Sequence, residues 1–155
     1  MTAPHPPIRA EQSPPNQTLD RFLDAQDKDF AAVCSELAAG RKRTHWMWFI
    51  FPQLRALGRS GTARHFGLED LAEAVAYWRH PTLGERLRHC TALVLDIQGR
   101  TAHEIFGSPD DLKLRSSMTL FEMAAAPEPA FGRVLDRYYG GGRDALTLNL
   151  VGAAP

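Results

Sequence analysis

The segment between Leu37 and Leu68 concentrates positive charge in a chain whose formal net charge is zero. It contains six cationic side chains and no carboxylate, and it also holds the aromatic run from His45 to Phe51. The six cations are Arg41, Lys42, Arg43, Arg55, Arg59 and Arg64. Guanidinium and ammonium groups form strong hydrogen bonds with phosphate and carboxylate groups. This segment therefore predicts a site for an anion.

The first candidate contact for a phosphate is the turn Gly58-Arg59-Ser60-Gly61-Thr62, which precedes a predicted short helix. Backbone N–H groups at a helix N-terminus and the positive end of the helix dipole both favour anions. The flanking glycines would let a phosphate approach the backbone, and Arg59 would add a charged fork. The alternative is that Ser60 only caps the helix and that the glycines only form the turn.

The second candidate site is the aromatic run His45-Trp46-Met47-Trp48, with Gln53 shortly after it. The indoles could stack on a planar ring or on a cation, and His45 could transfer protons near neutral pH. The alternative is that these rings fill the core, because a run that is apolar on every side is typical of a buried helix. Pro52 would end or kink such a helix, while the short length of the run would also suit a strand.

The third candidate site lies on the helix predicted after Ser108, where Asp110, Lys113 and Ser117 form one row at helical spacing. A lysine within reach of a serine can activate it as a nucleophile. His45 and Asp110 are the candidates for acid–base catalysis if a reaction occurs. The alternative is a solvated first turn whose hydroxyls bond back to the preceding backbone. No motif defines a reaction, so the sequence leaves open whether the protein is an enzyme.

The remaining sequence features limit the function classes. Cys34 and Cys90 are isolated within apolar helical patterns, which predicts reduced core thiols and a cytoplasmic protein. The spacing of histidines and cysteines supports neither a metal site nor a cofactor. No segment approaches the roughly 20 apolar residues that span a bilayer, and the start of the chain lacks the pattern of a signal peptide. Formal neutrality argues against a dedicated nucleic-acid binder, and a protein partner stays undefined.

Apolar residues recur at three- and four-residue steps along most of the chain, while alternating β-branched runs are scarce. This pattern predicts an all-α fold: one compact domain of about seven or eight helices over residues 18–155, with no significant sheet. Predicted helix boundaries include Gly40, His80-Pro81 and a Ser108 cap before Pro109. Residues 1–17 hold five of the eleven prolines, which predicts a disordered tail.

Several of these motifs together resemble one family. They are the segment from Arg41 to Gln53, Leu57-Gly58-Arg59-Ser60, the segment from Tyr77 to Leu83, the segment from Ile105 to Lys113, and the segment from Ser116 to Phe121. The family is the uncharacterised bacterial "domain of unknown function 1810", whose members sometimes carry the label calpastatin-like. The resemblance runs from about Leu19 to Leu150. It implies an all-helical single domain, and it implies no reaction.

The residues predict a cytoplasmic helical protein that binds a small anionic ligand, either phosphorylated or nucleotide-like. The expected ligand contacts are Arg41, Arg43, Trp46, Trp48, Gln53, Gly58, Arg59 and Ser60. One alternative is a non-catalytic module in which segment 41–64 docks an acidic protein surface or a nucleic-acid backbone. Another is that the aromatic run is entirely core and that any site lies elsewhere. That the aromatic run and the Ser108 helix lie side by side is a hypothesis at this point.

Overall fold

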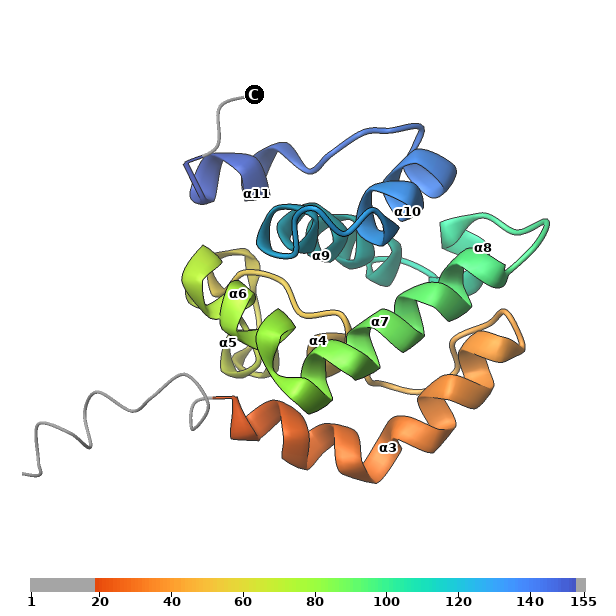
Figure 1. Cartoon of the computed structure of the whole chain (residues 1–155). Helices are drawn as coiled ribbons and strands as arrows, with labels where there is room; N and C mark the ends of the chain where they lie inside the picture. Colours follow the sequence, from red (N-terminus) through yellow and green to blue (C-terminus); the bar gives the residue numbers. More distant parts are fainter. Residues whose placement is uncertain (1–18, 153–155) are drawn as a thin grey trace, which may run out of the picture.

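A computed structural model describes residues 19–152, which fold into nine α-helices and one 3-10 turn without a named strand (Figure 1). The elements are α3 (Asp20–Ala38), α4 (Met47–Ile50), η1 (Arg55–Leu57), α5 (Gly61–His65), α6 (Leu71–Arg79), α7 (Pro81–Asp96), α8 (Ala102–Phe106), α9 (Asp110–Ala124), α10 (Ala130–Tyr139) and α11 (Ala145–Leu150). The predicted all-α single domain is confirmed. The helices outnumber the predicted seven or eight because α4, α5 and α8 have only four or five residues each. The predicted tail over residues 1–17 lies outside the described residues.

Helix α9 is the central element of the fold. It packs against α6, α8, α10 and α11, and Figure 1 shows it in the middle of the molecule. Leu114, Met118 and Phe121 are fully buried along it. A helix covered from several sides needs apolar residues on more than one stripe, which explains the sequence pattern of this segment. Helix α7 completes the packing against α3, α6 and α10.

Three helix boundaries were predicted from the local sequence. The structure agrees with two of them and differs at the third. Gly40, with φ of 77°, ends α3 in a Schellman motif, in which the N–H of Gly40 bonds to Leu37 and that of Arg41 bonds to Glu36. The Nδ1 atom of His80 caps α7. The predicted Ser108 cap is wrong, because α9 begins at Asp110 without any side-chain cap. Backbone carbonyls of the preceding loop bond to the first N–H groups of α9 in its place.

The aromatic run is mostly core. It forms the single turn α4, and the side chains of Trp46 and Phe49 are 1% and 6% exposed. The buried amide of Gln26 on α3 donates to the carbonyl of Phe49 at 2.6 Å and to the hydroxyl of Tyr77 at 2.9 Å. This amide therefore joins α3, α4 and α6, and it satisfies polar groups that burial would otherwise leave unpaired.

The loop before α4 is organised by one carboxylate, Glu36, which is 9% exposed. Its oxygens accept hydrogen bonds from the backbone N–H groups of Arg43 and Thr44, from the Thr44 hydroxyl at 2.6 Å, and from the Trp46 indole at 2.8 Å. Burial raises the pKa of Glu36, but these hydrogen bonds outweigh burial and lower its pKa to about 2. The ionised carboxylate thus holds residues 43–46 against α3.

We expect Glu36→Gln to lower the free energy of unfolding at pH 7 by about 2–3 kcal/mol, because four donors lose a charged acceptor and the amide adds competing donors. A carboxyl group with a depressed folded pKa contributes stability above its unfolded pKa of about 4.3 and loses it as the pH falls through the folded pKa. The difference from wild type should therefore shrink between about pH 5 and pH 2. Urea unfolding across this range measures it, with the exposed Glu85→Gln as control. Equal stability of Glu36→Gln and wild type at pH 7 would contradict the proposed role of Glu36.

Candidate functional site

One surface groove of about 630 Å³ brings together three segments that are distant in sequence. Its walls come from residues 53–63, from the first half of α9, and from the start of α11. Five residues singled out in the sequence lie there: Gln53, Gly58, Arg59, Ser60 and Lys113. The volume is within the range of about 300–1,000 Å³ that is usual for small-molecule sites.

The segment that carries Arg59 is folded back on itself. The N–H of Arg55 donates to the carbonyl of Leu68 at 2.7 Å, and the N–H of Leu68 donates to the carbonyl of Gln53 at 2.9 Å. Gly67 permits this approach, since a Cβ atom there would lie 2.3 Å from the Cα atom of Arg55. The turn that contains Arg59 therefore lies on the surface. Arg59 is exposed, and within residues 19–152 its guanidinium makes no ion pair or hydrogen bond.

The helix start at Ser60 contributes less to anion binding than the sequence predicted. The Ser60 hydroxyl accepts a hydrogen bond from the N–H of Ala63, so this cap is satisfied internally. Helix α5 has only five residues, and its dipole is correspondingly small. The positive charge of the groove therefore comes from side chains.

The second cation of the groove, Lys113, is held by two neighbours. Its Nζ atom lies 3.6 Å from a carboxylate oxygen of Asp110 and 5.4 Å from the centre of the Trp48 ring. The other oxygen of Asp110 lies 2.9 Å from Nζ of Lys42, a side chain that is only 7% exposed. Two lysines share one carboxylate, which leaves a net positive charge in the cluster. These contacts place the aromatic run beside α9, as hypothesised from the sequence.

The two tryptophans have different environments. Trp46 is buried, donates its indole N–H to Glu36, and lies 5.2 Å from Nζ of Lys42. Trp48 is half-buried beneath Lys113. Neither indole lines the groove, so neither is placed to cover a ligand ring there.

The remaining candidates from the basic segment lie away from the groove. Arg41 lines a separate hollow with Arg100 and His103. Arg43 is exposed, and its backbone N–H donates to Glu36. His45 is exposed, with its ring 6.5 Å from the Trp48 ring. In the described part of the chain, His45 and Asp110 form no hydrogen bond or ion pair with each other.

Ser117 is not accessible from the groove. It is fully buried, and its Oγ atom has no hydrogen-bond partner in the described part of the chain. A nucleophile must reach its substrate, so the lysine–serine interpretation lacks an accessible hydroxyl. The neighbouring Ser116 does line the groove, and its hydroxyl donates to the carbonyl of Leu112 at 3.3 Å. Helical spacing selected the row containing Ser117, whereas packing against the core left Ser116 at the groove.

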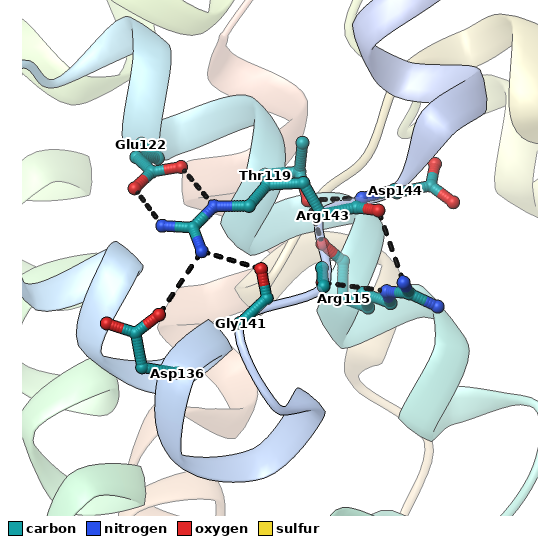
Figure 2. A network of polar contacts seen from close by, with 8 residues as sticks. Arg115, Thr119, Glu122, Asp136, Gly141, Arg143 and Asp144 are labelled. Carbon is teal, nitrogen blue, oxygen red and sulfur yellow. Dashed lines mark hydrogen bonds and ion pairs between the residues drawn. The ribbon is translucent and has the colours of Figure 1, made fainter. Parts of the chain in front are cut away.

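The wall formed by α11 was not predicted as part of a site. A polar network joins it to α9 and α10 (Figure 2). Arg143 forms two hydrogen bonds with Glu122, at 2.9 and 2.5 Å, and a third with Asp136 at 3.2 Å. The hydrogen bonds to Glu122 raise the pKa of the Arg143 guanidinium above its ordinary value. No local signal in the sequence indicated which helix α11 would contact.

The same network places Asp144 and Leu146 at the groove. Arg115 donates to the carbonyls of Gly142 and Arg143, and the N–H of Asp144 donates to the Thr119 hydroxyl at 3.0 Å (Figure 2). The Asp144 carboxylate then caps α11 by accepting from the N–H and the hydroxyl of Thr147.

Among residues 19–152, no group of three or more His, Cys, Asp or Glu side chains is arranged to hold a metal ion. None of the helices in the same range combines the length and the apolar character that a bilayer span requires.

The fold and the groove define a single-domain, all-α protein with a small, charged surface groove. The family described as "Protein of unknown function (DUF1810)" matches residues 16–151, and the chain belongs to this family. The chain is also similar to a solved structure, that of the conserved hypothetical protein Rv1873 from Mycobacterium tuberculosis. The two share 53% sequence identity with a TM-score of 0.86, and the match covers 88% of this chain and 97% of the other. No curated protein matches the chain.

We expect Arg143→Lys to loosen the α11 wall, because a lysine keeps the charge but cannot bond to both oxygens of Glu122 while contacting Asp136. The free energy of unfolding should fall by about 1–2 kcal/mol. Amide hydrogen exchange should become faster in residues 145–150 but not in α7. Arg133→Lys on the exposed side of α10 is the control. Unchanged exchange of α11 in Arg143→Lys would show that the network does not hold this helix.

Proposed function

We propose that this protein is a cytoplasmic small-molecule-binding protein that takes a small anionic ligand, phosphorylated or nucleotide-like, in the groove between residues 53–63, α9 and α11. One observation carries the proposal: Arg59 and Lys113, from distant parts of the chain, line the same groove with excess positive charge. Such charges favour phosphate and carboxylate groups.

The polar partners around these cations suit the same class of ligand. Gln53 lines the groove, and within the described residues its side chain makes no hydrogen bond. Its N–H groups can therefore donate to a ligand oxygen. The Asp144 carboxylate sets a limit, because it lowers the net charge of the groove and opposes highly charged ligands. A ligand of modest negative charge fits this balance better than a polyphosphate.

The docking alternative finds less support, because the cations of the basic segment do not form one surface. Lys42 pairs with Asp110, and Arg55 pairs with Glu69 at 3.0 Å. Arg41 and Arg64 line two hollows separate from the groove. A docking face for an acidic surface needs adjacent, unpaired charges, and these pairings and separations leave fewer of them on any one face.

No reaction is proposed for the groove. The acid–base candidates His45 and Asp110 are not paired with each other, and Asp110 is engaged by two lysines. Ser117, the candidate nucleophile, is buried and therefore cannot contact a ligand in the groove. Ligand binding is therefore the function that these residues support best.

We expect a thermal-shift screen against nucleotides, ADP-ribose, dinucleotides, sugar phosphates and inorganic phosphate to yield a selective stabiliser. A ligand at a hundred times its dissociation constant stabilises the folded state by about 2.7 kcal/mol, or about 5–10 °C in melting temperature for a domain of this size. Arg59→Ala and Lys113→Ala should each weaken binding by about 10- to 100-fold, because each removes a charge-assisted contact.

Arg43→Ala is the matched control, since it removes another exposed cation of the basic segment, one that lies outside the groove. Wild-type binding in Arg43→Ala together with loss in Arg59→Ala would support the groove. Equal losses in both variants would favour docking through the basic segment. A panel without any stabiliser would count against the proposed function.

A further inference from the structure

We infer that the ligand of the groove is amphipathic: an anionic group contacts Arg59 and Lys113, while an aliphatic or aromatic body lies against Leu112 and Leu146. This inference rests on the proposed function and specifies the chemical class of its ligand. The occupant is a small organic phosphate ester, because a volume of about 630 Å³ suits a small molecule better than a folded partner.

Exposed leucines mark one side of the groove. Among the described residues, the exposed large hydrophobic side chains are Leu112, Leu146 and Leu150, at 57%, 61% and 50%. Leu112 and Leu146 come from different helices, yet both line the groove, whereas Leu150 lines a neighbouring hollow. Apolar side chains that converge beside polar groups are typical of a ligand site, while single exposed leucines are ordinary.

Specific hydrogen bonds hold α11 on α9, and they thereby fix where Leu146 lies. Thr147, next along the chain, is fully buried, and its hydroxyl bonds to Asp144. Asp144 is in turn bonded to Thr119 on α9. With Thr147 turned into the protein and α11 held on α9, Leu146 lines the groove and is exposed to solvent.

The apolar side chains Leu112 and Leu146 also determine which part of the ligand the protein recognises. Trp46 and Trp48 do not line the groove, so ring stacking by these indoles does not contribute there. Leu57, Ala63 and Pro109 complete an aliphatic lining around the two exposed leucines. Such a lining contacts any apolar body of suitable size, so affinity should depend on apolar area more than on hydrogen bonds to the body.

The test uses calorimetric titration of the full chain with phenyl phosphate and with inorganic phosphate. Wild type should bind phenyl phosphate at least about tenfold more tightly than inorganic phosphate. Leu146→Ser should weaken phenyl phosphate binding by about tenfold and leave phosphate binding unchanged. Leu150→Ser is the matched control, because it lies on the same helix with similar exposure but outside the groove. Leu112→Ser provides a second, independent variant on α9.

The outcomes separate this inference from the proposed function. If Leu146→Ser and Leu112→Ser bind phenyl phosphate as wild type does while Arg59→Ala binds it weakly, the inference is overturned and the anion site stands. Equal wild-type affinities for phenyl phosphate and inorganic phosphate would also overturn the inference alone. If wild type binds no anion of the wider panel, the proposed function fails and this inference fails with it. Thermal melts of each variant verify folding, which substitution of leucines that are at least half-exposed should preserve.

Discussion

The structure around the candidate site depends on one buried carboxylate. Glu36 is kept ionised by four hydrogen-bond donors from residues 43–46, and those bonds hold the loop after α3 against that helix. In the loop so held, Trp46 lies in the core and Lys42 pairs with Asp110 on α9. Because a buried charge without partners is costly, this loop has little freedom to adopt another path. An interaction outside the groove therefore determines which residues of the basic segment can reach α9.

Helix α9 connects the loop held by Glu36 to the rest of the molecule. In its first turn, Asp110 forms an ion pair with Lys42, and Lys113 lies over the Trp48 ring. Its middle is buried in the core, and its later turns hold the loop before α11 through Thr119 and Glu122. The same helix thus supplies Lys113, one of the two cations of the groove, and holds the helix that carries Leu146. Changes far along α9 are therefore expected to alter the groove without touching it.

The distribution of charge shows why a charge-rich segment is not by itself a binding surface. Lys42 and Arg55 are paired within the fold, while Arg41 and Arg64 line two different hollows. Of the cations in the segment, only Arg59 lines the groove, where Lys113 joins it from outside the segment. The segment predicted an anion site, but the charges that converge come from two places in the chain.

Local sequence was sufficient for the fold class and for many boundaries, since helical periodicity, caps and helix-ending residues act within a few positions. Gly40 and His80-Pro81 mark the predicted boundaries, and Ser60 caps α5 as its alternative interpretation expected. Among the candidate site residues, the turn around Arg59 could be found by composition and Lys113 by helical spacing. Spacing could not distinguish Ser116 from Ser117, or the surroundings of Trp46 from those of Trp48. Those differences, and the inclusion of Asp144 and Leu146, were decided by the tertiary structure, because the contacts that produce them join helices far apart in sequence.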